Sequence, residues 1–364
     1  MIQRLLRGQA IYFILGCLIV VLYMRVARVA PPPPFEATRQ APSAGESPAH
    51  AAGAAAPDED RLQLLPSGHE LQQLSDAMLQ EPLLAALLLI LGTFMITLSV
   101  GGIAMAASGL WTGRIREVWQ YPSRRLPAWS FGELGRITVL TLIVISVLPL
   151  IRLATPLRHL ETKTDEHLWI SLSMLVLHVC VVLAILAFAI GKNRTVGRAL
   201  GFANRQLGPS LMAGVRGYVA VFPWLFVLLI ATVELFRFLG VKPPIEPIQE
   251  MVFQEQDPRV LVLTVLLACV MGPVAEELFF RGVLYPAVRH RTSRLVGMLV
   301  SGLAFSLVHT NPVGFLPIFV IGCLLADLYE RTGSLVAPLA VHIVHNTFLL
   351  SLALVVRRLL LVGN

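Results

Sequence analysis

Charged side chains are scarce in this sequence. Only 14% of its 364 residues are Asp, Glu, Lys or Arg, whereas soluble domains carry roughly 25%, and 56% are hydrophobic. The mean hydropathy is +0.73. These values exclude an ordinary soluble protein. Because apolar runs of about 20 residues recur along the chain, they predict an integral multi-pass membrane protein.

Cysteine is also scarce, and two protease signatures are missing. The four cysteines lie inside apolar runs without CxxC spacing, so we expect neither a disulfide framework nor a cysteine zinc site. The HExxH motif of helical zinc peptidases and the GxGD motif of presenilin-like proteases do not occur. No internal repeat is visible, so an inverted-repeat transporter has no support.

The net charge of +7 falls mainly on arginines in short loops. This distribution is typical of the positive-inside rule, and we expect no nucleic-acid partner. Three basic clusters, Thr112–Arg136, Lys192–Arg216 and Arg289–Arg294, fall on one side if every apolar run crosses the bilayer. That side is predicted to be cytoplasmic, together with the N-terminus. The arginine- and alanine-rich character favours a bacterial inner membrane.

The expected fold class is all-α, a polytopic membrane bundle of about nine transmembrane helices. The first span resembles a signal anchor, because no small-residue cleavage site follows it. The predicted spans are Ala10–Met24, Leu83–Ala107, Ile137–Thr155, Leu168–Ile190, Gly217–Leu239, Val260–Val288, Leu295–Val308, Gly314–Leu328 and Leu335–Val356.

Composition divides the chain into four regions. Residues 1–30 form the anchor, and residues 31–80 form an extracytoplasmic tether rich in Pro and Ala that cannot bury a core. A short amphipathic helix is expected at Leu62–Leu79. Residues 81–258 supply further membrane helices, and residues 259–364 form the core that carries the polar motifs.

The first polar motif is MGPVAEELFFRG, Met271–Gly282. Glu277 and Arg281 are spaced i, i+4 on one helical face and can form an ion pair. Glu276 points about 100° away and is not paired by this spacing. A buried structural ion pair explains two of these charges, but the second carboxylate suits a general base. Gly272–Pro273 is expected to loosen the helix beside a polar cavity.

Two further motifs follow in the last spans. His309 ends an apolar run, four residues after Phe305. His342 and Asn346 share a helical face, and His345 lies one turn from His342. A single membrane histidine is usually an interhelical hydrogen bonder, but together these groups suffice for acid–base hydrolysis: a base, its partner and donors for an oxyanion.

These motifs, EExxxR, FxxxH and HxxxN, match in order and spacing those of the CPBP family, which comprises type II CAAX prenyl endopeptidases and bacteriocin-processing or immunity proteins. The resemblance covers roughly Val260–Leu350. It implies an intramembrane endopeptidase that acts on a membrane-associated peptide or protein. By this resemblance Glu276 is the general base and His309 aids it.

The resemblance also assigns the remaining residues of the site. His342 and Asn346 would stabilise the oxyanion, while Glu277 and Arg281 would shape and charge the site. No cofactor is required by this arrangement. A zinc site built from His342, His345, Glu276 and His309 is the alternative. A catalytically silent scaffold or immunity protein of the same fold, and a transporter with a proton-relay carboxylate, also remain open.

Overall fold

The computed structural model describes residues 68–112, 126–155, 162–191, 197, 207–241 and 247–362. The predicted span Ala10–Met24 and the Pro/Ala-rich tether up to Asp60 lie outside these residues. Every regular element in the described residues is a helix, which confirms the all-α fold class.

The described helices overlap all eight of the predicted spans that fall among them. Within the described ranges six helices are long and apolar enough to cross a membrane, and Arg294–Val308 is a shorter apolar helix. In chain order the elements are α3 (Gly68–Gln80), α4 (Pro82–Trp111), α5 (Phe131–Ala154), α6 (Lys163–Ile190), α8 (Leu207–Phe238), α9 (Pro247–Gln254), α10 (Pro258–Leu266), η3 (Leu267–Met271), α11 (Gly272–Phe279), η4 (Phe280–Leu284), α12 (Tyr285–Arg289), α13 (Arg294–Val308), α14 (Phe315–Thr332) and α15 (Val336–Val362).

Two short helices flank the membrane helices. The amphipathic helix expected before the second span is present as α3, whose Ala77 packs against Val355 and Leu359 of α15. The second short helix, α9, lies in the connection before Pro258. Burial of Met251 and Val252 on one face of this segment explains the helix, because packing offsets its short length.

The segments from α10 to α12 form one continuous helix, Pro258–Arg289, with two widened π-helical turns. The N–H of Gly272 donates to the carbonyl of Leu267, and the N–H of Tyr285 donates to that of Phe280. A proline follows each of these donors in the sequence. Proline has no N–H and its ring clashes with the carbonyl four residues earlier, so a widened turn accommodates it. The loosening predicted at Gly272–Pro273 is therefore confirmed.

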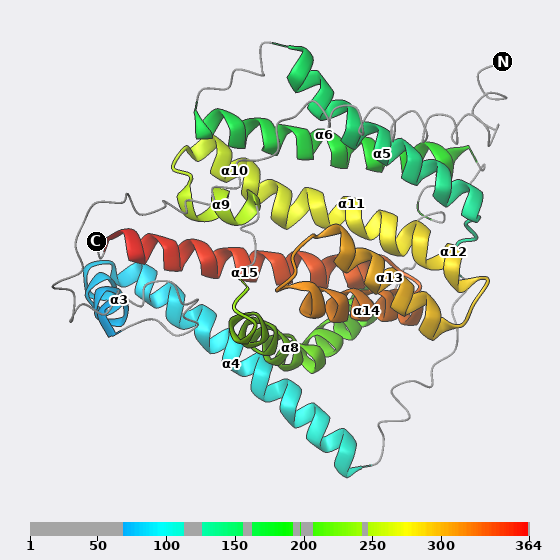
Figure 1. The fold of residues 1–364 in the computed structure, drawn as a ribbon. Helices are drawn as coiled ribbons and strands as arrows, with labels where there is room; N and C mark the ends of the chain where they lie inside the picture. Colours follow the sequence, from blue (N-terminus) through cyan, green and yellow to red (C-terminus); the bar gives the residue numbers. More distant parts are fainter. Residues whose placement is uncertain are drawn as a thin grey trace, which may run out of the picture. The chain divides into compact units, whose positions relative to one another are not determined.

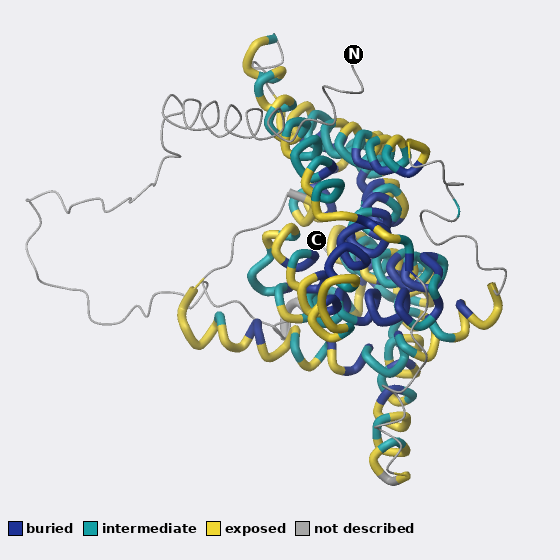
Figure 2. Tube along the Cα trace, turned by 90° about the vertical axis from the view of Figure 1, so that its right-hand side faces the viewer, coloured by how far each residue is buried: buried dark blue, intermediate teal, exposed yellow. Residues whose placement is uncertain are grey.

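This composite helix lies at the centre of the bundle (Figure 1). It packs between α6 and α15, α5 covers α6, and α13 and α14 lie along its C-terminal half. Helix α8 packs on α14 and α15, and α4 packs on α8. Buried residues accordingly gather in the middle of the tube view, while the outer helices are largely exposed (Figure 2).

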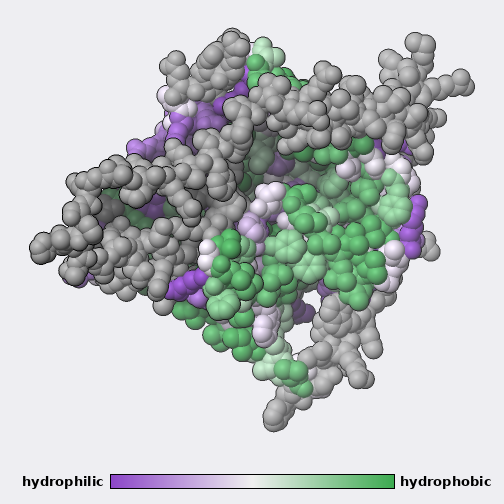
Figure 3. Space-filling view, in the orientation of Figure 1, coloured by the Kyte–Doolittle hydropathy of each residue, from purple (hydrophilic) through white to green (hydrophobic). Residues whose placement is uncertain are grey.

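The outer helices present apolar side chains to their surroundings. Only 6% of the apolar window of α4 is buried inside the protein, whereas 39% of that of the composite helix is buried. The space-filling view shows a broad apolar surface on the described helices (Figure 3). Since such a surface is unstable in water, this burial pattern agrees with an integral membrane protein.

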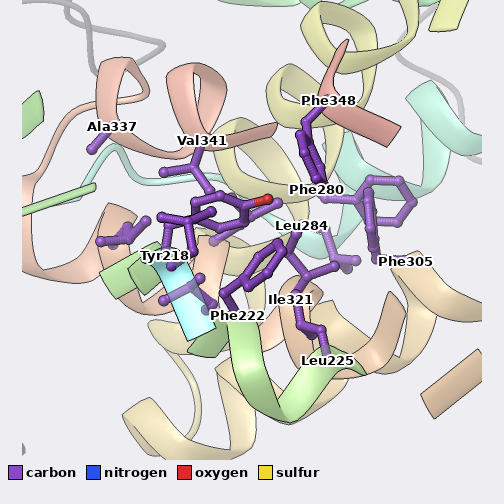
Figure 4. Packing of buried hydrophobic residues seen from close by; sticks show 14 of the residues in the cluster. Tyr218, Phe222, Leu225, Phe280, Leu284, Phe305, Ile321, Ala337, Val341 and Phe348 are labelled. Atoms are coloured by element: carbon purple, nitrogen blue, oxygen red, sulfur yellow. The ribbon is translucent and has the colours of Figure 1, made fainter. Parts of the chain in front are cut away.

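Aromatic side chains fill the core beside the polar motifs (Figure 4). The rings of Phe280 and Phe305 meet edge to face with centroids 5.2 Å apart, and Phe222 contacts Phe348 in the same way at 6.0 Å. Such pairs contribute about 0.5–1.5 kcal/mol beyond the area they bury. They hold the helices that carry the first two motifs in a defined register.

Helices α13 and α14 approach each other closely at two glycines. A Cβ on Gly322 would lie 3.0 Å from the Cα of Gly302, and a Cβ on Gly302 would lie 2.6 Å from the Sγ of Cys323. Small residues are the usual means by which membrane helices bring their backbones together. The two helices therefore form a tight hairpin.

Candidate active site

The predicted ion pair between Glu277 and Arg281 is present and fully enclosed. Arg281 Nη1 lies 2.7 Å from Glu277 Oε1, and the two side chains are 0% and 1% exposed. Arg281 Nη2 also donates to the carbonyl of Gly322 at 2.9 Å, and its guanidinium lies 4.4 Å from the ring centroid of Phe305. A buried arginine needs several such partners, because desolvation costs more than one ion pair returns.

The same carboxylate orients His342. The Nδ1 atom of His342 lies 2.8 Å from Glu277 Oε1, and both side chains are buried. Because a carboxylate accepts hydrogen bonds, the imidazole donates from Nδ1 and turns its Nε2 in the opposite direction. That second nitrogen faces Glu276.

Glu276 is the more open of the two glutamates, with 24% of its side chain exposed. Its Oε2 lies 3.8 Å from the Nε2 atoms of both His309 and His342. This spacing is too long for direct hydrogen bonds, and among the described residues Oε2 has no hydrogen-bond partner. One oxygen atom of a water or a substrate placed between them would reach the carboxylate and both rings.

His309 is held at the end of α13. Its Nδ1 lies 2.7 Å from the carbonyl of Phe305, and its ring packs on that of Phe305 at 4.6 Å. A carbonyl can only accept, so Nδ1 carries a proton, and in the neutral ring Nε2 would be an acceptor facing Glu276. The spacing FxxxH thus has a structural reason, because residue 305 supplies both the ring and the carbonyl.

Asn346 lies beside the widened turn η3. Its Nδ2 donates to the carbonyl of Ala268 at 2.8 Å. That carbonyl has no donor within its own helix. The N–H of Gly272 bonds to Leu267 instead, and Pro273 has no N–H to offer. Asn346 therefore satisfies a backbone group that the Gly-Pro pair releases, and a second N–H of the same amide remains.

The structure therefore brings all six residues predicted from the motifs together. His309 and His342 lie near Glu276, and Arg281 and His342 bond to Glu277. Asn346 bonds to the helix that carries both glutamates.

One histidine was missed. His178 of α6 and Oε1 of Glu276 both lie within 4 Å of the position that a Cβ on Gly272 would occupy. The Nδ1 of His178 is buried and has no hydrogen-bond partner in the part of the chain that the structure describes. Its signal in the sequence was a lone histidine in the apolar run Leu168–Ile190, a pattern that usually marks a packing residue.

His345 does not join the other histidines. Its Nδ1 lies 2.9 Å from the hydroxyl of Tyr218 on α8, and the two rings contact edge to face. Within the described ranges no three His, Cys, Asp or Glu side chains gather in an arrangement that would hold a metal ion. The four-residue zinc site considered from the sequence therefore loses His345 as a ligand in this conformation.

Comparison with known proteins matches the segment that carries the site. Residues 258–348 match the family described as "Type II CAAX prenyl endopeptidase Rce1-like". The chain is 29% identical over 92 residues, 25% of its length, to a Bacillus subtilis protein described as "Putative membrane peptidase YdiL". It is 28% identical over 152 residues, 40% of its length, to an Escherichia coli protein described as "Uncharacterized 24.3 kDa protein".

These alignments cover 38% of the Bacillus protein and 69% of the Escherichia protein. No solved structure matches the chain. The resemblance to the CPBP family that the three motifs indicate is confirmed over residues 258–348. The helices before residue 258 lie outside the family match.

Proposed function

We propose that this protein is an intramembrane endopeptidase that hydrolyses a peptide bond of a membrane-associated protein or peptide. The observation that carries the proposal is the position of Glu276, whose free Oε2 faces the Nε2 atoms of His309 and His342 at 3.8 Å. A carboxylate that shares an enclosed space with two imidazoles is a common means of activating water. The family match supports the same activity.

In the proposed reaction Glu276 accepts a proton from a water molecule while the water oxygen attacks the substrate carbonyl carbon. His309 accepts a hydrogen bond from the same water through its Nε2 and so aims it. The tetrahedral intermediate then collapses as the C–N bond breaks. Glu276 returns its proton to the leaving amine, and the products are a carboxylic acid and an amine.

The negative oxygen of the intermediate would be stabilised by His342 and Asn346. Asn346 has one N–H beyond the bond to Ala268. His342 can donate from Nε2 only when its ring carries a proton on both nitrogens, because Nδ1 already donates to Glu277. The two glutamates and Arg281 sum to one negative charge, so a positive His342 would make the cluster neutral.

Glu277 and Arg281 are positioning residues in this mechanism. Their enclosed pair fixes the ring of His342, and the bond from Arg281 to Gly322 ties α14 to the composite helix. Their hydrogen-bond partners are each other, Gly322 and His342. Their loss should therefore disturb folding as well as turnover.

The substrate would be a leader peptide or an anchored membrane protein, and the lipid bilayer is the second partner.

We further propose that the N-terminus and the basic end at Arg289–Arg294 face the cytoplasm of a bacterial inner membrane. Ser43→Cys should then react with an impermeant maleimide from outside, and Ser123→Cys should not. The reverse pattern would overturn this orientation.

The activity is tested by incubating wild type and Glu276→Gln with single-span peptides in liposomes and detecting products by mass spectrometry. Wild type should cleave, and Glu276→Gln should lose turnover while it still binds peptide, because Gln keeps the volume and loses the base. Glu234→Gln, an exposed position on α8, is the matched control and should cleave normally. A wild type that binds peptides without cleaving them would favour the silent scaffold.

A further inference from the structure

The two helices α13 and α14 are short for a membrane protein. Helix α13 has 15 residues and α14 has 18, while the composite helix beside them has 32. At about 1.5 Å per residue these lengths correspond to about 22, 27 and 48 Å. The hydrocarbon core is about 30 Å thick, so α13 cannot cross it.

Side-chain contacts fix the register between α14 and the composite helix. Arg289 pairs with Glu330 at 3.2 Å, and eight residues further along both helices Arg281 donates to Gly322. The two helices therefore run parallel and in step, since both contacts join residues 41 positions apart. Counting on in the same step, the first residue of α14, Phe315, lies level with Val274.

The hairpin therefore ends beside the catalytic glutamate. His309, the residue after α13, approaches Glu276 at 3.8 Å, in agreement with that count. Beyond this level the composite helix continues from Pro273 back to Pro258, about 24 Å, and there it packs on α6, α9 and α15 rather than on the hairpin. Figure 1 shows α13 and α14 along one half of the composite helix only.

Charged side chains form ion pairs at the base of the hairpin, where α13 begins and α14 ends. Arg294 of α13 pairs with Asp327 of α14 at 2.8 Å, and Arg331 pairs with the same carboxylate. Such a cluster belongs near the headgroups. From Arg294 to Val308 the helix rises about 21 Å, which is about 10 Å less than the thickness of the hydrocarbon core.

Side chains near the tip of the hairpin bond to its backbone. The N–H of Gly314 donates to Oδ1 of Asn311 at 2.6 Å, and next to the tip the hydroxyl of Ser306 donates to the carbonyl of Phe315 at 2.6 Å. Thr310 holds a left-handed backbone with φ of 53°. Irregular backbone is tolerated at membrane depth only where protein or a watery cavity supplies partners, and these two side chains supply such partners.

We propose that α13 and α14 form a re-entrant hairpin, which enters and leaves the bilayer at the basic end and places its tip, residues 309–314, at the depth of Glu276. The consequence for specificity rests on the proposed function. The scissile bond must then lie inside the membrane-embedded stretch of a substrate, about 20 Å from the basic end, because Glu276 lies 13 residues before Arg289.

The depth of the tip is measured without reference to activity. In a full-length chain whose four cysteines are replaced by Ala, a bimane probe is attached at Thr310→Cys, and quenching by lipids brominated along their acyl chains is recorded in liposomes. Leu303→Cys, exposed on the middle of α13, is the control for hydrocarbon depth. Thr292→Cys and Gln256→Cys, near the two ends of the bundle, are the controls for the surfaces.

Quenching of the Thr310→Cys probe should be close to that of Leu303→Cys. Quenching as weak as that of Gln256→Cys would overturn the re-entrant hairpin, because the tip would then reach the far surface. A second experiment uses a series of single-span peptides in which a Gly-Pro pair is moved by one residue at a time. Cleavage should be greatest when the Gly-Pro pair lies about 20 Å from the membrane surface at the basic end of the protein. Absence of all cleavage would reject the proposed function and leave the depth measurement to decide the hairpin.

Discussion

Glu277 and His342 form the contact on which the site depends, since Nδ1 of His342 lies 2.8 Å from Oε1 of Glu277 while its other nitrogen faces Glu276. The same Glu277 oxygen also accepts from Arg281. One buried carboxylate oxygen thus connects the structural ion pair to the reactive space.

Arg281→Ala should destabilise the protein as well as inactivate it. The substitution leaves Glu277 buried without its cation, which costs about 3–5 kcal/mol. Thermal unfolding in detergent should show a large decrease in the unfolding temperature and in folded yield. Arg237→Ala, which removes an exposed arginine, is the control and should be nearly neutral. Full stability of Arg281→Ala would contradict the structural role.

Asn346→Ala should reduce turnover by about 10²–10³, the cost of one oxyanion donor. It should also cost about 1–3 kcal/mol of stability, because the Ala268 carbonyl loses its donor. Adding Pro273→Ala supplies a backbone N–H near that carbonyl. The double variant should regain stability but not turnover. Recovery of both would assign Asn346 to positioning alone.

His178→Leu should lower kcat and leave KM nearly unchanged, because His178 lies near the proposed general base, Glu276. We expect a decrease of about tenfold, which is smaller than the roughly 10²–10⁴-fold contribution of a general acid or base itself. His178→Gln keeps a polar nitrogen and should retain more activity than the leucine variant. Met174→Leu, one turn earlier on α6, serves as the control. Equal activity of wild type and His178→Leu would remove His178 from the site.

Metal removal should leave the activity unchanged if water is activated by Glu276 and His309 alone. Turnover is measured before and after dialysis against a chelator, and metal content is determined by elemental analysis. One zinc per chain that is lost in His342→Ala, together with inactivation by the chelator, would overturn the metal-free mechanism. His345→Ala should have no effect on metal content in either case, since its ring bonds Tyr218.

Stability should fall at acidic pH through Glu255, which lies between α9 and α10. Burial raises the pKa of this carboxyl, but the amides of Asp257 and Gln256 and the side chain of His167 together lower it below its usual value of 4.5. A lowered folded-state pKa stabilises the protein at pH values above the unfolded-state pKa. This contribution is lost as the pH falls through the folded-state pKa.

Glu255→Gln tests this contribution. The variant should be less stable than wild type at pH 6 by about 1.5–3 kcal/mol, the value of hydrogen bonds to a charged group. The difference should shrink as the pH falls from about 6 to about 3, because wild type then loses the same charge. Asp76→Asn, on the exposed side of α3, is the control. A constant difference across this range would show that Glu255 acts by packing alone.

Local spacing in the sequence was enough to predict the all-α membrane fold, and it supplied the six candidate residues of the site. Apolar runs set the helices because the bilayer demands internal hydrogen bonds, and the i, i+4 spacing of Glu277 and Arg281 set their pairing within one helix. The three motifs and their order also identified the family of the last quarter of the chain. These are properties of local spacing, which a sequence contains in full.

Which helices bring the motifs together depends on packing between distant parts of the chain. The contact between His342 and Glu277 joins residues 65 positions apart, and that between Asn346 and Ala268 joins residues 78 positions apart. His178 reaches Glu276 from outside the motif segment, and His345 turns to Tyr218 although its spacing suggested a ligand. Helix packing settles such contacts, because the face that each helix buries depends on all of its neighbours. For the same reason the depth of the α13–α14 hairpin follows from its register with the composite helix and not from its hydropathy.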